Sequence, residues 1–95
     1  MDFQLRTFYQ QPVITYEMAP TVLRIGEFRF HFYSDEGNEP PHIHVTNNDG
    51  ECKFWLKPIK LASNKFWASH VVNKIEKLVY MHQEFLIEKY NEYHS

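Results

Sequence analysis

The sequence predicts an α+β fold in which a four-stranded, mainly antiparallel sheet carries one long C-terminal helix packed on one face. Two patterns predict this class. Apolar and polar residues alternate over residues 22–56, as in half-buried strands, and from residue 66 onward apolar residues recur at spacings of three and four, as in an amphipathic helix. The 95 residues are enough for one domain, and a 43% hydrophobic content supplies its core.

We expect an N-terminal arm, residues 1–18, followed by a single α+β domain over residues 19–95. Pro12 interrupts any helix in the arm, while residues 13–16 favour a short strand. The first residues do not resemble a signal peptide, and no apolar run approaches the ~18 residues that a membrane span needs.

The first two strands form a hairpin. Leu23 and Ile25 share one side of the first strand, and the stretch FRFHFY, residues 28–33, places its phenylalanines on one side of the second. Gly26 and Glu27 between them suit a two-residue type II′ turn, because glycine in the first position adopts the required positive φ.

The third and fourth strands follow an acidic loop over residues 34–41. HIHV, residues 42–45, turns Ile43 and Val45 inward and the two histidines outward. NNDG, residues 47–50, is a turn signal, ECKFWL is the fourth strand, and Pro58 ends it.

The C-terminal third predicts one long helix over residues 63–95, with a bend expected near His82 and Ser63 or Asn64 as the cap. At 1.5 Å per residue its apolar stripe extends about 40 Å, whereas the short strands span only ~20 Å. The last turns should therefore overhang the sheet and be covered by the N-terminal arm or by another subunit, and we predict a homodimer or a hetero-complex through this helix. The overhanging residues are Phe85, Leu86, Tyr90 and Tyr93.

The outward positions of the strands gather an unusual set of side chains. They combine cations for phosphates, aromatic rings for base stacking, and imidazoles that titrate near neutral pH. A purely polar, solvated sheet face is the alternative interpretation. The set is Arg24, Arg29, His31, Tyr33, His42, His44, Glu51, Lys53 and Trp55.

His42 and His44 belong to the stretch GNEPPHIHV, which holds two histidines beside two stiffening prolines. Their rings point to the same side, as in metal-binding H-x-H pairs. Three roles stay open for this pair: binding a metal, acid–base chemistry or contact with RNA, and a structural role in holding the loop. We expect no cofactor; if a metal were bound, Glu36 would be the third ligand, with Asp35, Glu39 and His31 as alternatives.

The neighbouring residues have narrower roles. Glu36 and Glu39 could orient the imidazoles, recognise a basic partner or merely solvate the loop. Lys53 and Arg24 are candidates for phosphate binding, and Tyr33 could donate a proton or stack.

Two other titratable residues are expected to have structural roles. His31 lies among phenylalanines and should be a partly buried structural histidine, and Cys52 falls on the apolar side and should be core. A lone cysteine excludes an internal disulfide, so we expect a reducing cytoplasm. The net charge of -2 does not indicate a general nucleic-acid binder.

Four stretches together resemble a bacterial family, the domain of unknown function 4160. They are PTVLRIG, FRFHFYSDEGNEPPHIHV, GECKFWL followed by proline, and the helix pattern I-x-x-LV, and the similarity covers residues 20–93. The motif positions carried by this chain are Arg24, Tyr33, Glu36, Gly37, Glu39, Pro40, Pro41, His42, His44, Lys53 and Trp55. Two features depart from the family: the first seventeen residues are an extension, and His31 stands where an aromatic residue is more usual.

The resemblance implies a small protein encoded beside a second one, and some members are described as DhiT-like toxins of type II toxin–antitoxin pairs. Our leading hypothesis is such a toxin, acting on RNA without a metal. His42 and His44 would be base and acid, Lys53 with Arg24 the cationic clamp, and Tyr33 and Trp55 the stacking groups, with Arg29 as a further substrate-binding residue. Alanine at either histidine should then abolish toxicity and leave the fold intact.

Two other classes of function remain open. The first is a non-enzymatic binding module in which Glu36 and Glu39 recognise a small antitoxin-like partner. The second is a metal-dependent hydrolase that uses the histidine pair and a carboxylate.

Overall fold

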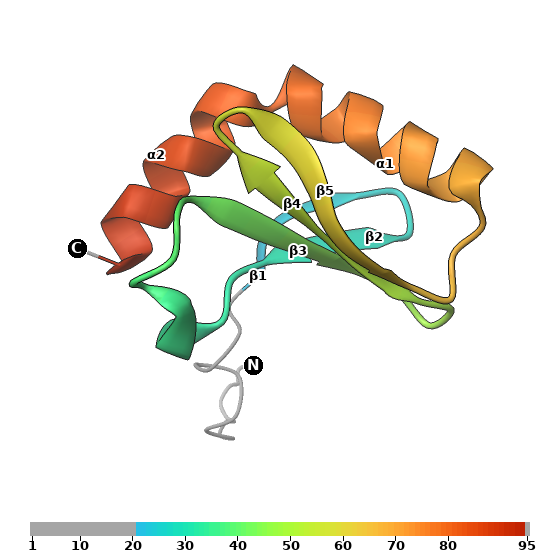
Figure 1. Cartoon of the computed structure of the whole chain (residues 1–95), viewed down its shortest axis with the longest axis horizontal. Coiled ribbons are helices and arrows are strands. Elements are labelled where there is room, and N and C mark those ends of the chain that lie inside the picture. Colours follow the sequence, from blue (N-terminus) through green and yellow to red (C-terminus); the bar gives the residue numbers. More distant parts are fainter. Residues whose placement is uncertain (1–20, 95) are drawn as a thin grey trace, which may run out of the picture.

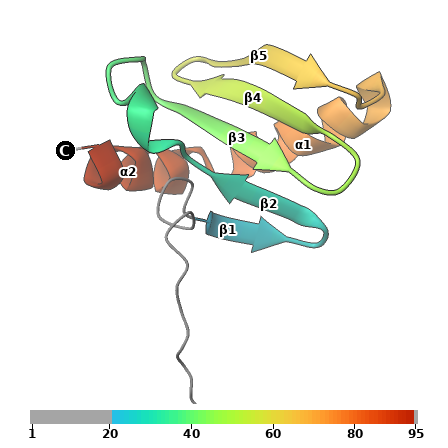
Figure 2. The same cartoon turned by 90° about the horizontal axis from the view of Figure 1, so that it is seen from below.

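The structure, a computed structural model, describes residues 21–94 and consists of one antiparallel sheet with two helices on one face (Figures 1 and 2). The five strands are neighbours in chain order: β1 (Thr21–Ile25), β2 (Phe28–His31), β3 (His42–Thr46), β4 (Glu51–Leu56) and β5 (Ile59–Lys65). The helices are α1 (Ser69–Met81) and α2 (Gln83–His94). The α+β class and the antiparallel sheet are confirmed, but the expected four strands and single helix are wrong. The arm, residues 1–18, lies outside the described residues.

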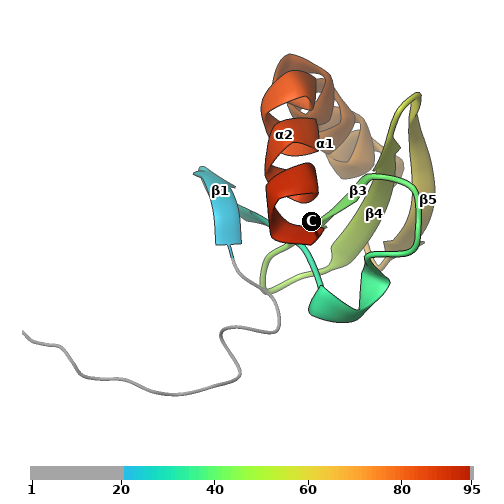
Figure 3. The same cartoon turned by 90° about the vertical axis from the view of Figure 1, so that its left-hand side faces the viewer.

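The two faces of the sheet are those that the alternation predicts. The side chains facing the helices form the core, and the largest fully buried ones include Phe30, Phe32, Phe54 and Ile43. Figure 3 shows both helices lying within the curve of the sheet. We call this the inner face and the opposite one the outer face. Cys52 is buried on the inner face, as expected, and burial followed by the charge of Glu51 raises the pKa of its thiol to about 12.

Strand β5 is the element that was missed. Residues Ile59–Lys65 pair with β4 after a turn that contains a cis Lys57–Pro58 peptide bond. Ser63 and Asn64 therefore lie in a strand and not at a helix cap; the helix begins at Ser69, with Ala68 at its N-cap. Of β5 only Ile59 is buried, so this edge strand has too few buried apolar residues to show the alternation of the others.

The helical region breaks at His82, where a bend was expected, into α1 and α2. After the break α2 continues beyond α1 and bends towards the sheet (Figure 1), and Leu86 and Tyr90 are both buried. The side-chain amide of Gln83 donates to the carbonyl of Leu56, 2.7 Å away, and ties the start of α2 to the end of β4. The premise that Leu86 and Tyr90 need a partner to cover them is therefore wrong.

The turns flanking β2 and β3 follow the sequence signals. Gly26 has φ of 57°, and Glu27 is not among the positive-φ residues, which agrees with a type II′ turn. At the other turn, a Cβ on Gly50 would lie 2.6 Å from the carbonyl oxygen of Lys65, so only glycine fits beside β5.

Between β2 and β3, residues 34–41 form what we call the covering loop. It starts with a 3₁₀ turn, Ser34–Glu36, and passes over one end of the outer face before it enters β3 (Figures 1 and 2). The hydroxyl of Tyr90 on α2 lies 2.8 Å from the carbonyl oxygen of Glu39 and 3.2 Å from that of Glu36, and donates its proton to this pair. The loop is thus held from the helix side as well as from the sheet.

Candidate functional site

The strand register brings most of the predicted residues together on the outer face. His44 lies opposite His31 on one side and Lys53 on the other, and His42 lies opposite Trp55. Directly opposed residues point to the same face of a sheet. The prediction that the imidazoles, Lys53 and Trp55 share one face is therefore confirmed.

The expectation that this face lies open is wrong for the imidazoles. The covering loop lies over them, so His42 is 0% and His44 only 6% exposed. Aromatic neighbours close the remaining sides: the His42 ring has Trp55 at 5.7 Å and Tyr90 at 5.4 Å between centroids, and the His44 ring has Tyr33 at 4.4 Å.

Glu36 connects the two histidines. Its Oε1 atom lies 2.7 Å from Nε2 of His42 and 2.7 Å from Nε2 of His44, so one carboxylate oxygen contacts both rings. Burial alone would raise the pKa of this carboxyl, but hydrogen bonds to His44 and His42 and their charges outweigh burial, and the pKa lies below its usual value. Glu36 is therefore a carboxylate at neutral pH.

The other ring nitrogens are also engaged. Nδ1 of His42 donates to the carbonyl oxygen of Pro40 at 2.8 Å, and Nδ1 of His44 lies 3.2 Å from Oε2 of Glu51. The hydroxyl of Tyr33 donates to the same Glu51 oxygen, at 3.3 Å. Burial, then the charge and hydrogen bond of Glu51, raise the pKa of Tyr33, so its phenol stays protonated at neutral pH.

Lys53 and Glu39 form the outer border of this cluster. The Lys53 amine donates to Oε1 of Glu39 at 2.6 Å and lies 4.6 Å from the centre of the Trp55 ring. Glu39 thereby fastens the covering loop to β4, as Glu36 fastens it to β3. Both carboxylates of the loop that were candidates for orienting residues do contact the sheet.

His31 lies behind His44 and is buried more completely than the partial burial expected for it. It is buried, its ring stacks on that of His44 at 5.7 Å, and its Nδ1 atom is buried without a hydrogen-bond partner. Burial, then the charges of Arg29 and His44, lower the pKa of His31 to about 3. It therefore stays neutral at physiological pH.

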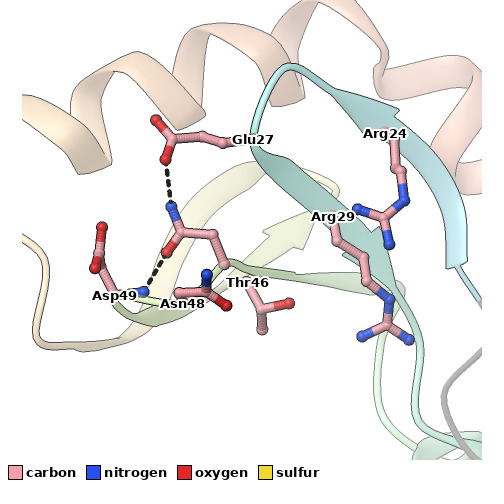
Figure 4. Close-up of a pocket in the computed structure, with 7 residues that line it drawn as sticks. Arg24, Glu27, Arg29, Thr46, Asn48 and Asp49 are labelled. Carbon is pink, nitrogen blue, oxygen red and sulfur yellow. Dashed lines mark hydrogen bonds between the residues drawn. The ribbon is translucent and has the colours of Figure 1, made fainter.

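Arg24 and Arg29 belong to a second group at the other end of the outer face. They are directly opposed on β1 and β2 and line a cavity of about 470 Å³ together with Glu27, Thr46 and residues 47–49. Figure 4 shows the two guanidinium groups near one another, with Glu27 and Asp49 on the opposite side. Asn47 joins the acidic side, since its amide donates to Glu27 at 3.0 Å and its Oδ1 accepts from the Asp49 backbone at 2.7 Å.

The expected clamp of Lys53 with Arg24 is not formed in the structure. Arg24 is in β1 and Lys53 in β4, three strand spacings or roughly 14 Å apart, and the Lys53 amine is paired with Glu39. Arg29 is the guanidinium that faces Arg24. The outer face thus has two separate centres, an imidazole cluster beneath the covering loop and an arginine cavity beside it.

Three participants were not foreseen in their roles. Glu51 was placed on the outer face but given no function, although it orients His44 and Tyr33. Tyr90 was expected to need a cover and is instead the side chain that holds the loop. His94, given no chemistry, packs over Gly37, where a Cβ would come within 2.9 Å of its ring. Only the acidic, outward position of Glu51 could have been noticed in the sequence.

The comparisons with known proteins agree with the motifs. A family model described as a domain of unknown function, DUF4160, matches residues 27–91. The chain belongs to this family. The match takes in the covering loop, both histidines, Lys53 and Trp55, whereas Arg24 lies just before its first residue. No curated protein and no solved structure matches the chain. In the described part of the chain, neither helix has the length and apolar character of a membrane span.

Proposed function

We propose that the protein is the toxin of a type II toxin–antitoxin module and that it acts on RNA through the outer face of its sheet. The observation that carries the proposal is the arginine cavity, where Arg24 and Arg29 are opposed on neighbouring strands of a chain with a net charge of -2. Local pairing of guanidinium groups in an acidic protein is typical of a specific anion site and not of general basicity.

The composition of the cavity suits a nucleotide. Its volume of about 470 Å³ lies within the usual range for small ligands. Arginine forks match phosphate oxygens, while the carboxylate and amide groups of Asp49 and Asn47 offer acceptors and donors for a base edge. Tyr33 and Trp55, half-buried on the same face, are the stacking candidates.

The acid–base roles of His42 and His44 place a further demand on the molecule. Both rings are buried and both nitrogens of each ring already have partners within the chain. Cleavage by these imidazoles therefore requires the covering loop to move first, whereas recognition of RNA at the arginine cavity does not involve that loop.

Arg24→Ala/Arg29→Ala is the variant that tests RNA recognition. We expect it to bind a fluorescein-labelled single-stranded RNA roughly 10-fold or more weakly than the parent chain, because each lost charged hydrogen bond contributes about 1.5 kcal/mol or more. The slope of log K against log salt should fall by about 0.7 for each lost phosphate contact. Fluorescence anisotropy over a salt series measures both quantities.

The matched control is Lys57→Ala/Lys77→Ala, which removes two exposed cations away from the cavity. The same variants, expressed from an inducible promoter with and without the neighbouring gene, report toxicity. Equal RNA affinity and equal growth arrest in the arginine and lysine variants would refute the proposal.

The antitoxin, we propose further, docks at the joint between α1 and α2. Tyr80 and Met81 are 59% and 72% exposed there, and Phe85 is also exposed. Met81→Asp should abolish co-purification with the product of the neighbouring gene, because a charge in an apolar contact leaves it unpaired and desolvated. Phe66→Asp is the matched control, since Phe66 is 89% exposed and lies in the segment that leads into α1, before the helix starts at Ser69. Loss of co-purification in the control alone would contradict this location.

The alternative of a non-enzymatic module that recognises its partner through Glu36 and Glu39 is less well supported. Both carboxylates already have partners within the chain, Glu36 with His42 and His44, and Glu39 with Lys53. A partner would have to displace these contacts before it could use either charge.

A further inference from the structure

The contacts around Glu36 require more positive charge than neutral histidines supply. A single oxygen, Oε1, lies 2.7 Å from the Nε2 atoms of both His42 and His44. A carboxylate oxygen only accepts hydrogen bonds, so each contact needs a hydrogen on the nitrogen or a cation between the atoms. A proton on Oε1 of Glu36 could form a hydrogen bond with only one of the two Nε2 atoms, so protonation of the carboxyl would explain only one of the two contacts.

The second nitrogen of each ring fixes which atom carries the hydrogen of a neutral imidazole. The carbonyl oxygen of Pro40 accepts only, so Nδ1 of His42 must carry a hydrogen. Nδ1 of His44 faces the carboxylate of Glu51 and is a donor for the same reason. In the neutral state both Nε2 lone pairs therefore point at Glu36, an arrangement that is repulsive unless a cation lies among them.

We propose that Nε2 of His42, Nε2 of His44 and Oε1 of Glu36 together bind one divalent transition-metal ion. The three atoms lie within 4.8 Å of one another. One divalent ion replaces the two Nε2 protons at equal charge, and both rings become neutral while they keep their Nδ1 hydrogens. The inference does not depend on RNA binding, and it replaces the expectation that the protein has no cofactor.

The surroundings match those of known metal-binding histidines. Such residues nearly always donate their second N–H to a carbonyl or a carboxylate, which sets the tautomer and ring orientation, and Pro40 and Glu51 supply these two acceptors. Metal–ligand bonds of ~2.1 Å place two ligands on one ion about 3.3 Å apart, so the two 2.7 Å contacts need to open by ~0.6 Å, and the two Nε2 atoms, which lie within 4.8 Å of one another, need to take the same separation.

The ligand set also defines the class of ion. Two imidazoles and one carboxylate favour Zn²⁺, Fe²⁺, Co²⁺ or Ni²⁺, whereas Mg²⁺ and Ca²⁺ prefer oxygen ligands. Because Glu36 comes from the covering loop and both histidines come from β3, the ion would also join the loop to the sheet.

Titration of the purified, chelator-treated full chain with ZnCl₂ tests the proposal. We expect one Zn²⁺ per chain by calorimetry and no binding of MgCl₂. Glu36→Gln and His44→Ala should each weaken Zn²⁺ binding by at least tenfold, the lower limit of what loss of even a supporting partner costs. The matched controls, exposed Glu84→Gln and His70→Ala, should bind as the parent chain does.

A second measurement keeps the test decisive if His44→Ala does not fold. Long-range ¹H–¹⁵N spectra report which imidazole nitrogen carries hydrogen, and Zn²⁺ should leave two histidines with hydrogen on Nδ1 only. Co²⁺ in place of Zn²⁺ should add visible absorption that Glu36→Gln abolishes. Absence of stoichiometric binding, binding unchanged in Glu36→Gln, or hydrogens on both nitrogens of both rings in saturating Zn²⁺ would each overturn the proposal.

Discussion

Tyr90→Ala is expected to lower the free energy of unfolding by about 3–5 kcal/mol, the usual cost of removing a large buried aromatic side chain. Tyr90 is buried, and its ring packs edge-on against Phe32, with centroids 5.5 Å apart, and next to His94 at 4.2 Å. Its hydroxyl is the contact from α2 that holds the covering loop. Urea denaturation followed by circular dichroism measures the loss.

Two further variants separate packing from hydrogen bonding at this position. Tyr90→Phe keeps the ring but leaves the carbonyl oxygens of Glu36 and Glu39 without this donor, and should cost only about 1 kcal/mol. Tyr80→Ala, at a tyrosine that is largely exposed, should stay within ~0.5 kcal/mol of the parent chain. If Tyr90→Ala were no more destabilising than Tyr80→Ala, Tyr90 would not hold the loop in solution.

His42→Ala should destabilise the protein by about 3 kcal/mol, in contrast to the intact fold that the sequence suggested for this variant. The loss of a fully buried ring opens a cavity between Trp55 and Tyr90 and removes the donor to the Pro40 carbonyl. Loss of toxicity in this variant would then report a weakened fold as well as any chemistry of the imidazole.

Thermal and urea unfolding of His42→Ala beside His70→Ala, which changes an exposed histidine of α1, measures this effect. The control should unfold as the parent chain does. Equal stability of the two variants would mean that the covering loop leaves His42 exposed in solution, which would restore it as a candidate base.

The two centres of the outer face can be tested separately because substitution of Arg24 and Arg29 removes none of the three proposed metal ligands, although a hydrogen bond between Thr46 and His31 links the two groups. The imidazole cluster is held by the covering loop and β4, whereas the arginine cavity is bordered by β1, β2 and the turn at residues 47–49. A failure of RNA binding at Arg24 and Arg29 would therefore leave the metal proposal untouched, and the reverse is also true.

The sequence alone determined the two hairpin turns at residues 26–27 and 47–50 and which side chains share the outer face. The alternation of Phe28, Phe30 and Phe32, and of Ile43 and Val45, is local, and a slip of one residue would bury charges. The same local pattern led to the correct grouping of His42, His44, Lys53 and Trp55.

The tertiary structure alone decided which segment covers that face and which strand forms the last edge of the sheet. Strand β5 forms because β4 offers it a free edge, not because its own exposed residues alternate. Glu36 reaches both imidazoles only because the covering loop returns over β3, and a tyrosine 54 residues further along holds that return. Contacts between residues so far apart in the sequence leave no local pattern. The burial of the two histidines could therefore be known only from the folded chain.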